Sequence, residues 1–200
     1  LEAFLEPLLK KANISSQIKV RVILNSSYNA FVTSDNVIYL HSGLLIKAES
    51  LEEVIGVMAH ELGHIVSGHV ARKNESLEVA RNASSLSTAL AAAAAIGGSE
   101  ELATSLLIGG NDRVARHYYY GSRINEAVAD EWALKMLDEL QISAVGMARM
   151  MKRLSNENAL PESYQSEYYR THPEAKRRLA VYEDHLTKSN FTNKRMNIAD

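Results

Sequence analysis

The amino-acid sequence predicts an α+β domain that is mostly helical, with a small β-sheet confined to its N-terminal quarter. β-branched residues in alternation occur between residues 17 and 41, whereas apolar residues follow helical spacing after Gly43. The length of 200 residues suits one compact domain, and 46% apolar with 23% charged residues is close to the average of globular proteins. These values argue against a disordered or fibrous chain.

The predicted sheet follows one short helix. Residues 1–12 carry apolar side chains on one stripe, which predicts an amphipathic helix despite Pro7. Residues 17–25 place an apolar residue at every second position, as a half-buried strand requires. Residues 29–33 and 36–41 flank a Ser-Asp pair that favours a tight turn, so we expect a β-hairpin there.

A long helix is expected next. Ser50 and Glu53 form a capping-box pattern that predicts its start, and helical spacing continues to about Arg72. The expected buried side of this helix consists of Val54, Val57, Met58, Leu62, Ile65 and Val66.

The remainder of the chain is predicted to be helical. Residues 83–110 are alanine-rich and interrupted by two Gly-Gly pairs, which predicts a tightly packed helical hairpin. Helical spacing also predicts helices over residues 123–140 and 143–154. A last helix is expected after Thr171, which forms a second capping-box pattern with Glu174 and has a proline in the first turn.

Charge and cysteine content exclude several classes of function. Lysine and arginine total 22 against 24 acidic residues, and a net charge of -2 offers no general attraction for nucleic acid. The sequence has no cysteine, so disulfides, thiol nucleophiles and cysteine zinc ligands are excluded together. Any metal site must therefore use His, Asp or Glu.

Neither a targeting peptide nor a membrane-spanning segment is visible in the sequence. The chain starts at Leu1 without a basic segment and apolar run, so we expect a trimmed sequence in which no targeting peptide is visible. Residues 82–99 are uncharged but too rich in Ser and Thr to span a membrane. We assign residues 1–187 to a single domain and residues 188–200 to a polar tail or linker.

The sequence His60-Glu61-Leu62-Gly63-His64 carries the strongest chemical signal. Inside a helix the two histidines lie one turn apart on one face, where two imidazoles can bind one metal ion. Glu61 then projects beside the ion, where its carboxylate can take a proton from bound water. The competing interpretation is a helix with two solvent-facing histidines and a glutamate.

A catalytic zinc needs a third protein ligand. The metzincin pattern fails, because Ser67 and Val70 stand where it requires Gly and His. Glu126 and Asp130 lie one helical turn apart beside small alanines at 127, 129 and 133, which permit close helix packing. Glu126 could bind zinc while Asp130 accepts the second ring N–H of a ligand histidine; the alternative is a solvated acidic face.

The combination of His-Glu-x-x-His with Glu-x-x-x-Asp on a second helix resembles the gluzincins. Further segments make the chain similar to zinc metallopeptidase family 48, which includes HtpX, the CAAX prenyl endopeptidases and BepA-like proteins. The segments that agree are Asn29-Ala30-Phe31, Val37-Ile38-Tyr39, Gly43-Leu44-Leu45, Ser122-Arg123, and Thr171-His172-Pro173 with Arg178. The resemblance covers nearly all of the chain and is greatest to the soluble periplasmic BepA-like members. Val128 departs from the family, in which a second glutamate is frequent.

The resemblance implies a zincin-like fold with the HExxH motif on an active-site helix. It also implies one Zn²⁺ per chain, bound by His60, His64 and Glu126 with water in the fourth position. Glu61 is the implied general base, and Asp130 orients a ligand histidine.

His172 is implied to come near the zinc, in one of two roles. It would either donate a hydrogen bond to the oxyanion or occupy the water position as a fourth ligand in a latent state. The third interpretation is a histidine at a helix terminus without a role in the chemistry.

The implied activity is endopeptidase cleavage of extended or misfolded protein substrates in the bacterial periplasm, in protein quality control. An extended substrate is expected to pair with the hairpin edge at residues 30–33. The apolar stretch from Leu86 to Ile108 could contact a membrane or an envelope protein, although packing in the core is the expected role.

Two other classes of protein compete with this prediction. A membrane-embedded peptidase of the HtpX or prenyl-protein type would require apolar spans of about 20 residues around the domain, which this sequence lacks. A zinc-binding scaffold without turnover would not need Glu61, because structural zinc requires no adjacent base.

Overall fold

A computed structural model describes residues 1–14 and 18–194; within its two longest helices the side chains of residues 71–77, 79–81, 83–84 and 108–121 lie outside that description. The chain forms two compact units, Leu1–Gly68 with Asn125–Asp200, and His69–Ile124. The predicted α+β class, with a small N-terminal sheet, is confirmed.

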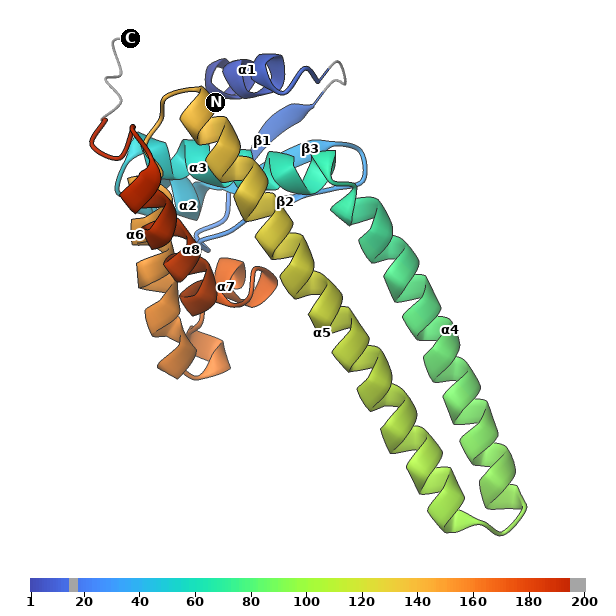
Figure 1. Ribbon diagram of the computed structural model, residues 1–200. Helices are drawn as coiled ribbons and strands as arrows, with labels where there is room; N and C mark the ends of the chain where they lie inside the picture. The colour runs from blue at the N-terminus through green and yellow to red at the C-terminus, as the bar shows by residue number, and fades with distance from the viewer. Residues whose placement is uncertain (15–17, 195–200) are drawn as a thin grey trace. The chain divides into compact units, whose positions relative to one another are not determined.

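Helices dominate the chain (Figure 1). In chain order the elements are α1 (Glu2–Lys11), β1 (Lys19–Ile23), β2 (Ala30–Val32), β3 (Val37–His41), α2 (Ser42–Lys47), α3 (Leu51–Val66), α4 (His69–Ile96), α5 (Glu100–Glu139), α6 (Val145–Asn156), η1 (Glu157–Ala159), η2 (Glu162–Tyr164), α7 (Glu167–Thr171) and α8 (Ala175–Lys188).

The sheet has three strands in the order β1-β3-β2. The predicted hairpin is confirmed, because β2 pairs antiparallel with β3 and Phe31 lies opposite Tyr39. β1 pairs parallel with the other side of β3, with Val20 opposite Ile38. The predicted first residue of β1, Gln17, lies outside the described residues. β2 is therefore an edge strand of the sheet.

The start of α3 agrees with the sequence. The Ser50 hydroxyl accepts a hydrogen bond from the Glu53 backbone N–H at 3.3 Å, which caps the helix. The carboxylate of Glu53 accepts from the Glu49 N–H and not from that of Ser50, so the capping box is not reciprocal. This carboxylate is fully buried, where it also accepts from Tyr28 and Arg153.

The end of α3 differs from the prediction. The helix ends at Val66 and α4 begins at His69, so a single helix running to Arg72 is wrong. Gly68 adopts φ +65, a left-handed conformation that terminates helices and favours glycine. Val66 is also exposed and Ile65 only partly buried, whereas the other four residues of the predicted buried side are buried.

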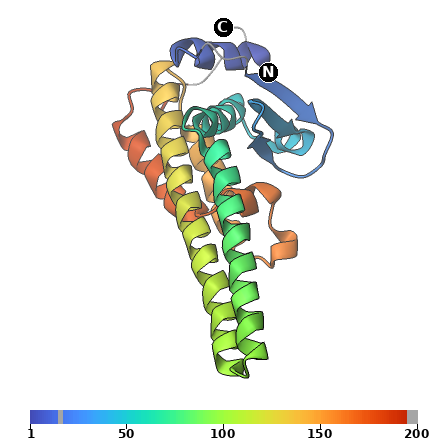
Figure 2. The same cartoon turned by 90° about the vertical axis from the view of Figure 1, so that its right-hand side faces the viewer.

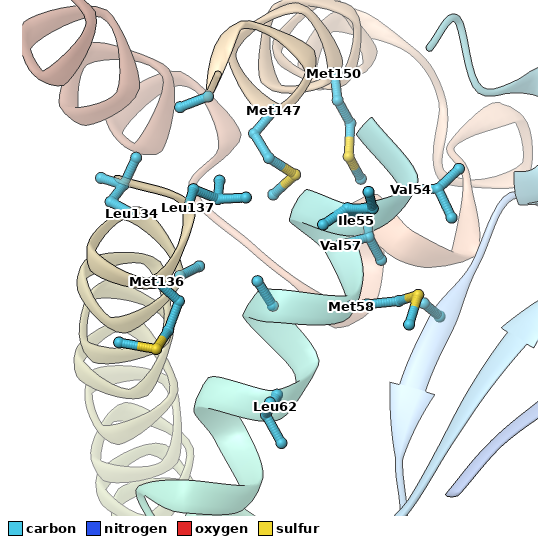
Figure 3. Close-up of a cluster of buried hydrophobic side chains, with 14 of the residues drawn as sticks. Val54, Ile55, Val57, Met58, Leu62, Leu134, Met136, Leu137, Met147 and Met150 are labelled. Atoms are coloured by element: carbon cyan, nitrogen blue, oxygen red, sulfur yellow. The ribbon is translucent and has the colours of Figure 1, made fainter. Parts of the chain in front are cut away.

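The core of the first unit lies around α3. Met147 and Met150 of α6 and Leu137 of α5 point toward Ile55 and its neighbours on α3 (Figure 3). At Gly56, a Cβ atom would lie 2.3 Å from the side chain of Met147, so glycine lets α6 approach closely. This packing fixes α3, and with it the HExxH motif, from two sides.

The second unit is the helical hairpin predicted from its alanines. α4 and the following part of α5 lie side by side and antiparallel (Figures 1 and 2), joined by a turn in which Gly98 adopts φ +80. The Gly-Gly pair at 109–110 remains inside α5, so the second predicted interruption is wrong. Continuous backbone hydrogen bonding across α5 accommodates both glycines.

Among the described side chains of the hairpin, those on the inner face pack closely. Ala91 and Ala103 are buried, and the Ser87 hydroxyl donates to the Leu106 carbonyl at 2.9 Å. Leu86 and Leu102, by contrast, are exposed. Among the described residues, no helix is both long and apolar enough to cross a membrane.

The C-terminal elements correct the second capping box. Thr171 is the last residue of α7, and its hydroxyl donates to the Glu167 carbonyl within that helix. Glu174 adopts φ 68 and provides no side-chain cap for α8, so the predicted box is wrong. Pro173 lies between α7 and α8 rather than in the first turn of α8. Of the predicted tail, residues 188–194 are described, and the rest lies outside the description.

Candidate metal centre

The two histidines of the HExxH motif face one another from α3. His60 and His64 are both buried, and their Nε2 atoms lie 3.1 Å apart. One helical turn separates the two residues, so the geometry of the helix itself brings the two nitrogens together. The interpretation as solvent-facing histidines is wrong, because neither side chain is exposed.

The third group comes from α5. The Glu126 carboxylate places Oε2 3.3 Å from His60 Nε2 and Oε1 3.4 Å from His64 Nε2. The helices approach closely because position 63 is glycine: a Cβ there would lie 2.9 Å from the Ala129 carbonyl oxygen. Of the small residues predicted to permit this approach, Ala129 and Ala133 are buried, but Ala127 is exposed.

His172 joins these groups at the end of α7. One ligand atom from each of His60, His64, Glu126 and His172 lies within 4.8 Å of the other three. Zinc bonds to nitrogen are about 2.0–2.1 Å long, and tetrahedral geometry then separates two ligand atoms by about 3.3 Å. The measured separations around His60, His64 and Glu126 fit this value, so the donor set suits zinc.

The two nitrogens of the His172 ring have different neighbours: Nδ1 lies beside Thr171, and Nε2 lies beside Glu61. The Thr171 hydroxyl donates to the Glu167 carbonyl at 2.9 Å, and it lies 2.9 Å from His172 Nδ1. While that hydroxyl donates to Glu167, its oxygen can accept from Nδ1–H of His172, and in this tautomer Nε2 carries the lone pair. Nε2 is then the nitrogen able to bind a metal.

Asp130 holds the opposite side of the His60 ring. Its Oδ1 lies 2.9 Å from His60 Nδ1, which leaves Nε2 directed at the cluster. Arg178 donates to both oxygens of Asp130, at 2.7 and 2.8 Å, and Tyr182 donates to Oδ1 at 2.7 Å. Arg178 Nη1 also lies 2.9 Å from Glu126 Oε2. Both carboxylates are therefore tied to one buried guanidinium.

Glu61 lies beside the cluster rather than within it. It is buried, and its Oε1 lies 3.2 Å from His172 Nε2 but accepts no aligned hydrogen bond from any described residue. Burial alone would raise the pKa of Glu61, but His172, His60 and His64 lower it below the ordinary value. The group is therefore an ionised carboxylate, as a base must be.

The same balance of burial against charge applies to the other acidic groups. Burial would raise the pKa of Glu126, but Arg178 and the surrounding histidines hold it well below its usual range. For Asp130, Arg178 and His60 likewise overcome burial and lower the pKa. Both carboxylates carry full negative charge toward a cation.

The two histidines of α3 differ electrostatically. Burial and Arg178 act to lower the pKa of His60, yet Asp130 and Glu126 outweigh them and raise it to about 9. Burial lowers the pKa of His64, with Glu126 opposing that effect. The nearby carboxylates therefore favour the protonated form of His60 more than that of His64.

Sequence reasoning missed three residues of this site. Arg178 was only part of a family signature, and Tyr182 and Tyr168 carried no signal by themselves. Arg178 and Tyr182 are separated by one helical turn, so a helical pattern with both on its buried face could have indicated them. Tyr168 is fully buried, and burial raises the pKa of its hydroxyl well above the ordinary value, with Glu61 adding to the effect.

An HExxH helix that meets a glutamate from a second helix defines a class of metal-dependent hydrolases. The model of Peptidase family M48 matches residues 1–185, and the chain belongs to this family. It therefore carries a metallopeptidase domain, and the resemblance predicted from the motifs is confirmed. Val128, where the sequence departs from the family, is exposed.

Two named proteases are similar to this chain. Metalloprotease LoiP of Escherichia coli strain K12 is 29% identical over 176 residues, which cover 88% of this chain and 66% of LoiP. A putative beta-barrel assembly-enhancing protease of Vibrio cholerae is 32% identical over 138 residues, which cover 68% of this chain and 28% of that protein. The chain thus spans less than two thirds of the length of either relative.

Proposed function

We propose that residues 1–187 are the catalytic domain of a zinc-dependent endopeptidase, with residues 188–200 as a polar tail. One observation carries this proposal: the ligand atoms of His60, His64, Glu126 and His172 converge in a buried cluster. A carboxylate base, Glu61, lies directly beside that cluster. A scaffold that only binds zinc has no use for such a base.

The proposed chemistry divides the work among named residues. Bound Zn²⁺, held by His60, His64 and Glu126, would polarise the substrate carbonyl and lower the pKa of water from about 16 toward 7. Glu61 accepts the proton of the attacking water on its carboxylate and delivers it to the leaving amine nitrogen. Asp130 keeps the proton of His60 on Nδ1, so that Nε2 is free to bind.

The substrate is proposed to be an extended or unfolded protein segment. β2 is an edge strand, and such an edge can pair with the backbone of a substrate while reading few of its side chains. The proposed role is protein quality control in the bacterial periplasm, and it is supported by one relative that is named a putative beta-barrel assembly-enhancing protease.

The direct test combines zinc analysis with cleavage of a general substrate. We expect about one zinc per chain by elemental analysis and cleavage of casein at internal bonds, identified by mass spectrometry. Removal of zinc by a chelator should abolish cleavage, and added zinc should restore it. Zinc binding without cleavage would instead favour the scaffold, and cleavage that survives complete zinc removal would contradict the proposal.

A further inference from the structure

The hydroxyl of Tyr168 is a buried polar group close to the candidate metal centre. Tyr168 is fully buried, and its Oη atom has no hydrogen-bond partner among the described residues. Buried tyrosine hydroxyls nearly always have a hydrogen-bond partner, so an unpaired hydroxyl is a candidate for a functional role. By comparison, the hydroxyl of Tyr182, also fully buried, donates to Asp130 at 2.7 Å.

Tyr168 is held firmly in the metal centre. Its ring stacks on the His172 imidazole, with ring centres 4.0 Å apart and an angle of 14° between the planes. Its backbone N–H donates to the Tyr28 carbonyl at 3.2 Å, and its own carbonyl accepts from the His172 N–H at 2.8 Å. The ring therefore has little freedom to turn its hydroxyl elsewhere.

The Tyr168 hydroxyl is surrounded by the charged side chains of the candidate metal centre. Its oxygen lies within electrostatic range of the Glu61, Glu126 and Asp130 carboxylates and of the Arg178 guanidinium, yet it is hydrogen-bonded to none of them. Tyrosine has an ordinary pKa of about 10, so at neutral pH this hydroxyl is a proton donor. A hydroxyl without a partner in such a buried site can donate a hydrogen bond to a substrate atom that gains negative charge during the reaction.

Peptide hydrolysis creates such a group. The developing oxyanion needs a hydrogen-bond donor besides the metal. In the tautomer whose proton lies on Nδ1 toward Thr171, His172 has no proton on Nε2 and cannot donate from that nitrogen. Tyr168 is the adjacent side chain with a free O–H.

We propose that Tyr168 is a catalytic residue that donates a hydrogen bond from Oη to the carbonyl oxygen of the scissile peptide bond. As the water oxygen bonds to the carbonyl carbon, the C=O π pair moves onto this oxygen, and the phenol stabilises the charge without losing its proton. Glu61 takes the water proton and returns it to the amine nitrogen when the C–N bond breaks. This inference rests on the proposed endopeptidase function.

Tyr168→Phe tests the role, because it removes the hydroxyl and keeps the ring. Casein-derived peptide cleavage should show kcat lower by about 10²–10³-fold with KM within about twofold, since an oxyanion donor acts only in the transition state. Zinc affinity and melting temperature should match the parent. Binding of a phosphinic peptide, a mimic of the tetrahedral adduct, should weaken by a similar factor in calorimetry.

Tyr28→Phe is the matched control, because its hydroxyl donates to Glu53 at 2.6 Å and not into the metal centre. It should lower the melting temperature and leave kcat unchanged. A Tyr168→Phe protein whose kcat is within twofold of the parent value would overturn the proposal. A parallel loss of zinc affinity and kcat in this variant would also overturn it, because it would indicate a structural role for the hydroxyl. The endopeptidase proposal is tested separately by whether the parent protein cleaves casein at all. The role of Tyr168 is tested by the ratio of kcat in the variant to kcat in the parent.

Discussion

The two sides of the metal centre differ in how their buried polar atoms are paired. On the anchoring side, Asp130 accepts hydrogen bonds from both Arg178 and Tyr182 and contacts His60. On the reacting side, Glu61 Oε1 and Tyr168 Oη are equally buried but have no aligned hydrogen bond among the described residues. An unpaired buried polar atom costs about 1–3 kcal/mol of stability.

This difference shows how the chain divides its functions. The paired groups around Asp130 hold His60 in position and stabilise the fold, whereas Glu61 Oε1 and Tyr168 Oη remain able to bond to a substrate or to water. Substitutions on the anchoring side should therefore change stability together with metal affinity. Substitutions on the reacting side should change turnover and leave the fold intact.

The largest effect is expected from the ligands, which connect the two sides. Replacement of His60, His64 or Glu126 by Ala should remove zinc and activity together, because three protein ligands are the minimum for a catalytic site. Elemental analysis and casein cleavage measure both. The control is Glu131→Ala, because Glu131 is an exposed glutamate on α5, the helix that carries Glu126. This variant should change neither zinc content nor casein cleavage. Full zinc occupancy in Glu126→Ala would remove this residue from the ligand set.

The reacting side alone is tested by Glu61→Gln. The amide keeps the shape of the side chain but cannot accept the water proton, so turnover should fall by about 10²–10⁴-fold. Zinc content, peptide binding and melting temperature should remain those of the parent. Cleavage at the parental rate would show that another group acts as the base.

His172→Ala distinguishes the two roles left open for that residue. If His172 is a fourth ligand that occupies the water position, its loss should raise casein cleavage and weaken zinc binding. If it donates to the oxyanion, its loss should reduce turnover by about 10²–10³-fold with zinc retained. Unchanged zinc affinity and unchanged cleavage would leave His172 without either role.

The anchoring side is tested at Asp130. Either Asp130→Ala or Asp130→Asn should weaken zinc affinity or activity by about 10–100-fold. The sequence alone predicts an intact fold for the alanine variant, but the structure predicts a loss of about 3–5 kcal/mol, because the buried Arg178 keeps its contact with Glu126 but loses both hydrogen bonds to Asp130. Urea denaturation of the two variants measures this loss. Equal stability of Asp130→Ala and the parent would contradict the division between the two sides.

The smallest change in activity is expected at the contact between α3 and α5. Gly63→Ala places a Cβ 2.9 Å from the Ala129 carbonyl oxygen and must push α5 away, at a cost of about 1–3 kcal/mol. Because α5 carries Glu126, zinc affinity should fall with the melting temperature. Gly97→Ala is the control, since its Cβ would make only ordinary contacts of 3.4 Å and more. Parental zinc affinity in Gly63→Ala would show that the close approach does not position Glu126.

The sequence by itself determined the features that depend on local geometry. Helical spacing brings His60 and His64 together, the side chain of Ser50 caps α3, and the hairpin of β2 and β3 follows from alternation around a turn. Each pattern involves residues only a few positions apart, whose relative placement is fixed by the backbone. The family and the metallopeptidase class follow from the same short motifs.

Only the tertiary structure decided which distant groups complete the site. Arg178 and Tyr182 reach Asp130 across about fifty positions of sequence, and α7 brings Tyr168 and His172 against α3. It also decided local conflicts: the Thr171 hydroxyl bonds within α7 instead of capping α8, and Gly68 ends α3 before Arg72. Spacing along the chain carries no information on such contacts, because they depend on how helices pack and on which buried charge can find a partner.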